Sequence, residues 1–131
     1  MTVITVRSYH LDGYGHVNNA RYLEFLEEAR WVFFGQHDLL PKLGNILLVV
    51  SRIDIRYLRA ATEHQVLHIR TQIPNMAEKA ILLRQTITRG DTGKTVAEAD
   101  VTLKPVNPQT GHTTALPDEL IRTLNLLGES L

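Results

Sequence analysis

The chain has 131 residues, 44% hydrophobic and 21% charged, which suits one globular domain with its own core. Lysine plus arginine and aspartate plus glutamate number 14 each, and cysteine is absent, so we expect no nucleic-acid partner and exclude disulfides, thiolate metal sites and a cysteine nucleophile. We recognise no signal peptide and no apolar run long enough to span a membrane, and therefore predict a cytoplasmic protein.

The first expected elements are a strand and a long helix joined by a polar loop. A β-like segment covers Val3 to Ser8. Apolar residues then recur at helical spacing, which predicts a helix from Asn19 to Phe34. Asn18 or Asn19 can cap the start of this helix, and Gly35 can end it.

The helix is expected to be covered on more than one side. Leu23, Trp31 and Phe34 widen its apolar stripe. We interpret Trp31 as a core residue, with the alternative that these three side chains line a tunnel between subunits. Glu27 and Arg30 are spaced for an ion pair, which indicates that both lie on the polar side.

The pattern after the helix is typical of strands. Ile46 to Val50 is continuously apolar, as in a strand covered on both faces, and alternation then continues to Tyr57. Turn residues at Pro74-Asn75 and at Gly90 to Gly93 separate the later strands. The remaining expected elements are strands over 67–73, 80–88 and 94–106 and a helix that begins near Pro117.

Consecutive strands with short turns favour an antiparallel sheet, and one long helix can cover one of its faces. We therefore predict an α+β fold in a single domain over residues 1–131, with a five-stranded antiparallel sheet, one long helix on one of its faces and a C-terminal helix. The free edges of such a sheet also favour dimerisation.

Asp12 is the principal candidate for chemistry because it directly precedes the helix start. A carboxylate there can act as a base or nucleophile while unpaired helix N–H groups hold a developing oxyanion. Asp12 could equally be a turn residue, and Asn18 and Asn19 could be helix caps. His16 could be a base, a hydrogen-bond donor or a residue that ties the loop together.

Three other site types are not favoured. His10, Asp12 and His16 could suggest a metal site, but their spacing is not diagnostic, and we expect no metal. The stretch Gly13 to Asn18 lacks the third glycine of a dinucleotide fingerprint, and no G-x-S-x-G serine motif occurs.

Three arginines could hold phosphates or form a solvated strand face: Arg52, Arg56 and Arg59.

The sequence around Asp12 resembles a known signature. Asp12-Gly-Tyr-Gly-His16-Val17-Asn18-Asn19-Ala-Arg-Tyr22, followed by Glu24 to Arg30, is similar to the D-x3-H-V-N-N-x2-Y…E-x-A-R pattern of hotdog-fold thioesterases in the 4-hydroxybenzoyl-CoA thioesterase-like superfamily. Within that family, Tyr9 to Trp31 most resembles the bacterial long-chain acyl-CoA thioesterases, and the likeness continues through Ile53 to Arg59.

The resemblance implies hydrolysis of medium-to-long-chain fatty acyl-CoA to fatty acid and CoA, without metal or organic cofactor. It further implies that the sheet wraps around the long helix, and it implies a homodimer or homotetramer with active sites at the dimer interface. Asp12 matches the family's catalytic acid, and the helix-start N–H groups match its oxyanion donors. The site residues expected on this basis are Asp12, His16 and Asn18 for catalysis, Val17 and Asn19 for the oxyanion, and Tyr22 and Arg59 for substrate binding.

Two alternatives stay open. The chain could hydrolyse acyl-carrier-protein thioesters, although the similar plant enzymes have an asparagine where this chain has Tyr14. It could also be a hotdog protein that binds acyl thioesters without cleaving them, although the retained Asp12 favours catalysis.

Overall fold

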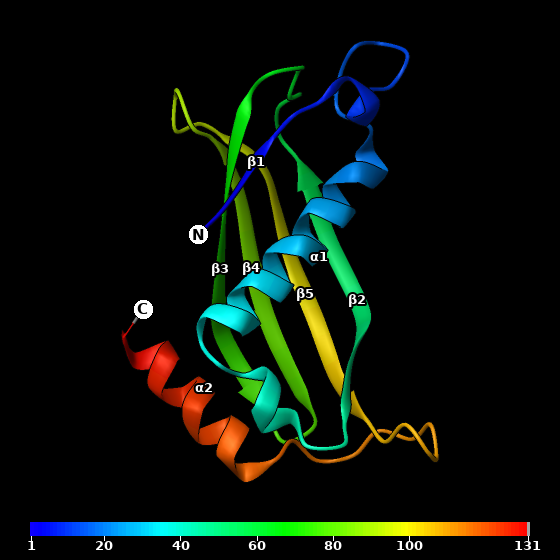
Figure 1. The fold of residues 1–131 in the computed structure, drawn as a ribbon, viewed down its shortest axis with the longest axis vertical. Helices are drawn as coiled ribbons and strands as arrows, with labels where there is room; N and C mark the ends of the chain where they lie inside the picture. Colours follow the sequence, from blue (N-terminus) through cyan, green and yellow to red (C-terminus); the bar gives the residue numbers. More distant parts are fainter. Residues whose placement is uncertain (131) are drawn as a thin grey trace. The chain divides into compact units, whose positions relative to one another are not determined.

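A computed structural model describes residues 1–130. Within these residues, five strands form one antiparallel sheet in the order β1-β3-β4-β5-β2, so that β1 and β2 are its edges (Figure 1). No helix in this range is both long and apolar enough to span a membrane. The elements in chain order are β1 (Thr2–Thr5), η1 (Ser8–His10), α1 (Asn19–Gln36), η2 (Leu40–Leu43), β2 (Leu47–Tyr57), β3 (Val66–Ala77), β4 (Ala80–Arg89), β5 (Thr95–Val106) and α2 (Asp118–Ser130).

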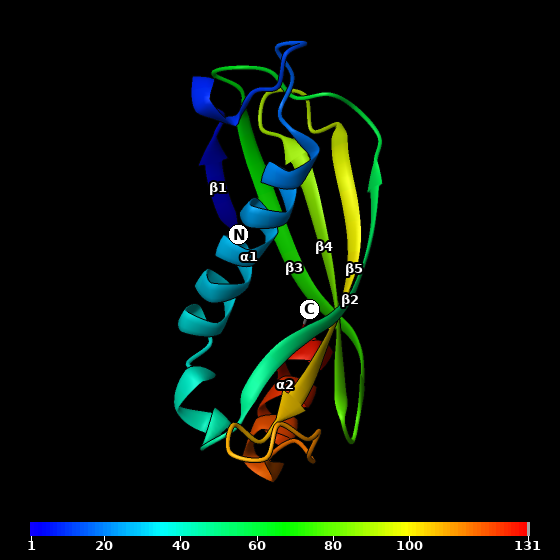
Figure 2. The same cartoon turned by 90° about the vertical axis from the view of Figure 1, so that its right-hand side faces the viewer.

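The chain divides into two compact units. Unit 1 comprises Met1–Phe33, Ile55–Thr71 and Gln85–Ala99. Within it, α1 lies on one face of the strands (Figure 2). The buried side chains of this unit include Tyr22, Phe25, Leu26, Ala29 and Phe33 of α1 and Leu67, Ile69, Ile87 and Val96 of the sheet.

Unit 2 comprises Phe34–Asp54, Gln72–Arg84 and the residues from Asp100 onward. Its helix α2 buries Leu120 and Leu124 and contacts η2. The Ile121 N–H donates to the carbonyl of Pro117 at 3.0 Å, so the helix starts directly after this proline, as predicted.

A polar cluster lies between α1 and the sheet in unit 1. Gln85 of β4 is fully buried, and its amide nitrogen donates to the Leu26 carbonyl and to Thr71 Oγ1, each at 3.1 Å. Arg30 Nη1 donates to Gln85 Oε1 at 3.1 Å, and Arg30 is only 8% exposed. The expectation that Arg30 lies on the polar side of the helix is therefore wrong, because a buried glutamine on β4 binds its guanidinium.

The α+β arrangement is confirmed, as are the long helix and the hairpin at Gly90 to Gly93, whose Gly93 has a φ of +72°. The turn expected at Pro74-Asn75 is wrong, because β3 continues through these residues and reverses at Glu78 and Lys79. The register of β1 on β3 ends at Ile69. Pro74 therefore lies in the part of β3 that is no longer paired to β1. At that position the strand can contain a residue without an N–H.

Two expectations about burial are also wrong. In β2, Leu47 is 52% and Val49 is 44% exposed, because β2 is an edge strand and not a strand covered on both faces. Trp31 is 60% exposed and lines an open groove together with residues of β1 and η1, so it is not a core residue.

Candidate active site

The loop between η1 and α1 is a tight turn built around the Asp12 carboxylate. Asp12 Oδ1 accepts hydrogen bonds from the Tyr14 N–H at 2.8 Å and the His16 N–H at 3.2 Å. The Asp12 N–H donates to the His16 carbonyl at 2.7 Å, and Gly15 supplies the positive φ that closes the turn. Within residues 1–130, the second oxygen, Oδ2, accepts no hydrogen bond. The two N–H groups bound to Oδ1 orient the carboxylate, and Asp12 as a residue is solvent-exposed.

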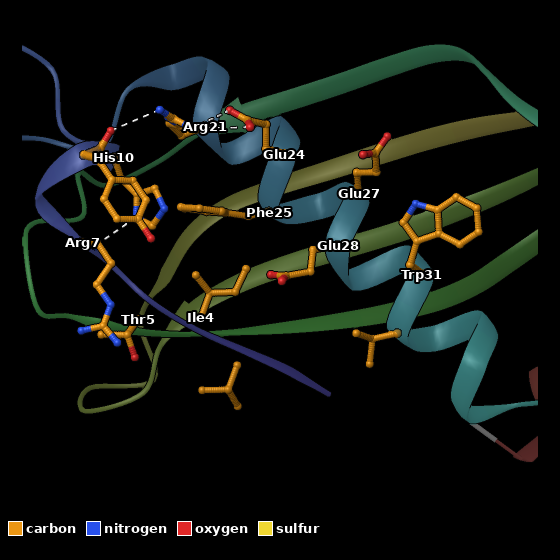
Figure 3. A pocket seen from close by; sticks show the side chains of 13 residues that line it. Ile4, Thr5, Arg7, His10, Arg21, Glu24, Phe25, Glu27, Glu28 and Trp31 are labelled. Atoms are coloured by element: carbon orange, nitrogen blue, oxygen red, sulfur yellow. Dashed lines mark hydrogen bonds and ion pairs between the residues drawn. The ribbon is translucent and has the colours of Figure 1, made fainter.

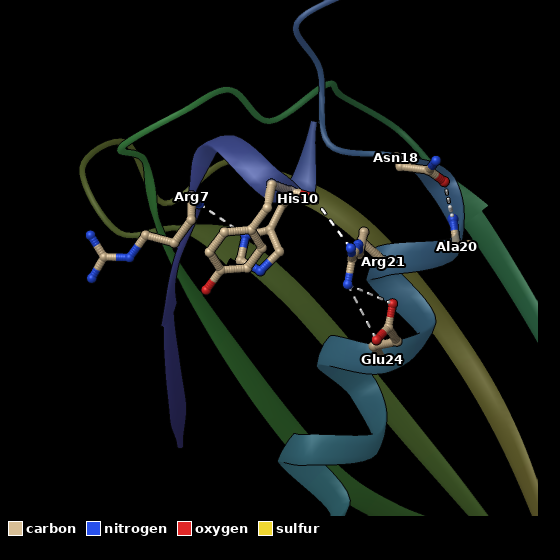
Figure 4. Close-up of polar contacts among 7 residues, drawn as sticks. Arg7, His10, Asn18, Ala20, Arg21 and Glu24 are labelled. Carbon is tan, nitrogen blue, oxygen red and sulfur yellow. Dashed lines mark hydrogen bonds and ion pairs between the residues drawn. The ribbon is translucent and has the colours of Figure 1, made fainter. Parts of the chain in front are cut away.

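The start of α1 leaves one backbone donor unused. Asn18 Oδ1 caps the helix by accepting the Ala20 N–H at 2.9 Å (Figure 4), and the Asn18 carbonyl accepts the Arg21 N–H at 2.9 Å. Within residues 1–130, the Asn19 N–H donates to no other group. It therefore stands at the positive end of the helix dipole with its hydrogen available.

The two donors that precede Asn19 are engaged. The Val17 N–H donates to the Ala61 carbonyl and the Asn18 N–H to the His10 carbonyl, each at 2.9 Å. These bonds hold the end of the Asp12 loop between η1 and the segment after β2. In this conformation Val17 therefore supplies structure, and Asn19 supplies the free N–H at the helix start.

Two tyrosines border this helix start. Tyr22 is buried, and its hydroxyl oxygen accepts the Ala61 N–H at 3.3 Å. The Tyr57 ring centroid lies 5.5 Å from that of Tyr22, and the Tyr57 hydroxyl donates to the Asn19 carbonyl at 3.1 Å. Burial raises the pKa of Tyr22, with smaller contributions in the same direction from Tyr57 and the Asp12 charge. Asp12 thus acts electrostatically on Tyr22.

Comparison with known proteins identifies the family. Residues 6–124 match the model of a family described as the thioesterase-like superfamily. The chain belongs to the thioesterase-like superfamily.

Relatives of this thioesterase-like protein agree in sequence and fold. It is 44% identical over 121 residues to the long-chain acyl-CoA thioesterase FadM of Escherichia coli K12, a match that covers 91% of this chain and 92% of the relative. Its structure matches that of the probable thioesterase YbaW from Escherichia coli with a TM-score of 0.88, at 42% identity over 96% of both chains. A thioesterase from Thermus thermophilus, solved with coenzyme A and Zn, matches with a TM-score of 0.84 at 25% identity, over 98% of this chain and 93% of that one. The expected hotdog fold and the thioester-hydrolase class are confirmed.

In this thioesterase-like protein, His10 stabilises the chain just before the Asp12 loop through a hydrogen bond and ring contacts. Its Nδ1 accepts the Arg7 N–H at 2.9 Å (Figure 4), and its ring lies edge-on to Tyr9 and Phe25 at centroid distances of 4.4 and 4.8 Å. Burial, and next the charge of Arg21, lowers the pKa of His10. Within residues 1–130, no group of three or more His, Cys, Asp or Glu side chains is placed to hold a metal ion.

The lowered pKa of His10 predicts a pH dependence of stability. Because the pKa of His10 is lowered on folding, the unfolded chain binds a proton that the folded protein excludes. The free energy of unfolding should be highest above about pH 6.5, the ordinary histidine pKa, and should fall as the pH drops from there through the folded pKa. Urea unfolding of the wild type and of His10→Asn, whose Oδ1 can replace Nδ1 as acceptor, measures this effect between about pH 5 and 7.5. Parallel pH profiles for the two proteins would contradict it.

The remaining predicted residues lie at the same end of unit 1. His16 is exposed and forms a β-bridge with Thr62, so its backbone ties the Asp12 loop to the segment after β2. Arg59 lies in that segment, and its Nη1 donates to the Thr95 carbonyl at 2.7 Å. Both side chains are reachable from solvent. The sequence analysis did not select Tyr57; its position at the end of the alternating strand was the one available signal.

A separate groove lies between β1, η1 and α1. It has a volume of about 750 Å³, and its lining includes the exposed Trp31 and a row of acidic side chains (Figure 3). Arg21 crosses one end, donating to Glu24 Oε1 at 3.2 Å and to the Tyr9 carbonyl at 3.3 Å. Neither Asp12 nor Asn19 lines this groove, so the candidate catalytic groups face elsewhere.

Proposed function

We propose that this protein hydrolyses medium-to-long-chain fatty acyl-CoA thioesters to free fatty acid and CoA. The observation that carries the proposal is that the loop before α1 presents the exposed Asp12, oriented through Oδ1, and that the Asn19 N–H at the start of α1 is unused. The choice of a long-chain acyl-CoA rests on the 44% identity to FadM. We further propose that residues 1–131 act as a single hotdog domain in the cytoplasm.

The proposed oxyanion donor is the Asn19 N–H. A thioester carbonyl oxygen placed against it would gain a hydrogen bond and the positive end of the α1 dipole. Both effects strengthen as negative charge develops on that oxygen, so they favour the transition state over the bound substrate. The Asn18 cap keeps the neighbouring Ala20 N–H occupied and holds the first helical turn in place.

Asp12 would act on the carbonyl carbon in one of two ways. Its Oδ2 could attack directly, expelling the CoA thiolate and leaving a mixed anhydride that water then hydrolyses. Alternatively, Asp12 could remove a proton from water as the water attacks. Either route consumes one water and releases the acid and CoA. The backbone N–H groups of Tyr14 and His16 hold Oδ1 and so orient Oδ2 in both cases.

The other predicted residues take supporting parts in this proposal. Asn18 acts through the helix cap, and Val17 acts through its bond to Ala61. Tyr22 forms the buried wall beside the helix start. Arg59 is fixed by Thr95 through one N–H group, and its exposed guanidinium would bind an anionic part of the substrate.

A hydrolysis assay tests the proposal and separates it from its alternatives. Released thiol is measured with palmitoyl-CoA and with palmitoyl-acyl-carrier protein at equal concentrations. We expect kcat/KM to be higher for the CoA thioester. A preference for the carrier protein would indicate the first alternative, and binding of palmitoyl-CoA without thiol release would indicate a non-catalytic binding protein.

We propose that the protein is a homodimer, or a homotetramer built from dimers, joined through β2. This edge strand has 11 residues with exposed Leu47, Val49 and Val50, whereas the edge strand β1 has four residues. A long apolar edge is stabilised by pairing with another chain. Light scattering should give at least a dimer mass, and Val49→Lys should reduce it to the monomer while Val3→Lys on β1 leaves it unchanged. A fully active wild-type monomer would contradict the proposed interface.

A further inference from the structure

We propose that Tyr57 is a positioning residue that holds the first turn of α1, and with it the Asn19 N–H, in the geometry needed to bind the oxyanion. The inference rests on the proposed function, and it assigns a task to a hydroxyl group at the end of an edge strand. The supporting contact is the hydrogen bond from the Tyr57 hydroxyl to the Asn19 carbonyl at 3.1 Å.

This contact completes the anchoring of one peptide group. The peptide between Asn19 and Ala20 has its N–H bound to Asn18 Oδ1 at 2.9 Å and its carbonyl bound to the Tyr57 hydroxyl. A peptide group is planar, so fixing both of its ends fixes the plane. The adjoining peptide carries the Asn19 N–H, and its carbonyl, that of Asn18, is bound by the Arg21 N–H. Of the groups in these two peptides, the Asn19 N–H alone is left without a partner in residues 1–130.

The anchor is itself supported. The Tyr57 ring packs on the ring of Tyr22 at a tilt of 53°, and the Tyr22 hydroxyl accepts the Ala61 N–H. The carbonyl of the same Ala61 accepts the Val17 N–H. A closed set of contacts therefore runs from the end of β2 through Tyr22 and Ala61 to the chain just before the helix start. The hydrogen bond from the Tyr57 hydroxyl to the Asn19 carbonyl then connects this set of contacts to the first turn of the helix.

The position of Tyr57 also suits a role in catalysis more than one in the core. Its side chain is 45% exposed, whereas Tyr22 is 3% exposed, so burial of the Tyr57 ring is not its main contribution. A tyrosine hydroxyl keeps its proton at neutral pH, and partial burial raises the pKa of Tyr57 further, so the hydroxyl remains a donor. Removal of this hydroxyl should loosen the helix start with little loss of packing.

The test is Tyr57→Phe, which removes the hydroxyl and keeps the ring, with Tyr9→Phe as the matched control on an exposed tyrosine outside the site. With palmitoyl-CoA, kcat of Tyr57→Phe should fall about tenfold, the typical effect of one hydrogen bond between neutral groups. KM should stay within about twofold, because the bond acts on a donor that strengthens in the transition state. The melting temperature should change by no more than about 2 °C.

A spectroscopic readout separates positioning from stability. A palmitoyl-CoA analogue with a methylene in place of the thioester sulfur keeps the carbonyl and cannot be hydrolysed. When it is bound to the wild type, its labelled carbonyl stretch should lie below the value in water, because the Asn19 N–H polarises it. The shift should be smaller in Tyr57→Phe and unchanged in Tyr9→Phe. Replacement of Tyr57 by 3-fluorotyrosine, a stronger donor, should keep the shift at least as large as in the wild type.

Three outcomes would overturn the inference. Wild-type kcat in Tyr57→Phe, in an enzyme that does cleave palmitoyl-CoA, refutes the role of Tyr57 and leaves the proposed function standing. A lower kcat with an unchanged carbonyl shift and a lower melting temperature assigns the hydroxyl to stability alone. Failure of the wild type to cleave any acyl thioester removes the proposed function, and the inference with it.

Discussion

Replacing Asp12 with asparagine is expected to remove nearly all thioester hydrolysis while the protein folds normally. Asparagine is nearly isosteric, and its Oδ1 can still accept the Tyr14 and His16 N–H groups that shape the loop. It carries no negative charge and can neither attack a carbonyl nor deprotonate water. The expected loss in kcat is roughly 10²- to 10⁴-fold, or about 3 to 5 kcal/mol of activation free energy. Thiol release from palmitoyl-CoA measures it.

The matched control is Asp91→Asn, the same substitution at an exposed aspartate in the β4–β5 turn, where the carboxylate pairs with Arg89. This variant should retain wild-type activity. Circular dichroism and thermal melting establish that both variants are folded. Activity of folded Asp12→Asn within about threefold of the wild type is far outside the range for loss of a general base, and would show that Asp12 is a turn residue only.

The second large effect is expected from the length of the acyl chain. Each buried CH₂ contributes about 0.8 kcal/mol, which corresponds to roughly a fourfold gain in kcat/KM until the binding site is full. We expect kcat/KM to rise steeply from butyryl- through octanoyl- to lauroyl-CoA and then to level off. The half-buried Leu23 of α1 is an apolar surface that such a chain could cover.

The chain-length series needs two controls. All substrates are used below their micelle-forming concentrations, since aggregated substrate would mimic a plateau. Benzoyl-CoA separates an apolar tunnel from a short aromatic pocket. If acetyl- or benzoyl-CoA is cleaved as efficiently as lauroyl- or palmitoyl-CoA, the long-chain preference is wrong, and the thioesterase assignment is unaffected.

Much of the fold could be predicted because local patterns carry it. The stripe that includes Tyr22, Phe25 and Phe33 has helical spacing, and these residues are buried. The Gly90 to Gly93 turn needs a positive φ, which glycine supplies at Gly93. The cap at Asn18 and the turn around Asp12 were also among the expected structures, because short polar side chains there bind backbone groups close in sequence.

What the sequence did not reveal depends on neighbours distant in the chain. Arg30 is buried because Gln85 binds its guanidinium. Gln85 lies 55 residues away in sequence, so local patterns could not indicate this contact. Pro74 continues a strand because β1 is too short to pair with β3 at that position. In the candidate site, periodicity could not indicate that Ala61 would bind the Val17 N–H or that Tyr57 would reach the Asn19 carbonyl.

The unused N–H at the start of α1 belongs to the backbone, whereas the Asp12 carboxylate belongs to a side chain. Mutation therefore affects these two proposed catalytic groups differently. Every side chain at position 19 except proline preserves an N–H, so the donor survives drift in sequence as long as the helix begins there. The carboxylate at position 12 has no such protection, because a single-base change can remove it. A saturation library selected for thioesterase activity should therefore tolerate many residues at position 19 and very few at position 12. Half of the proposed chemistry is thus supplied by the fold itself, and the other half depends on a single side chain.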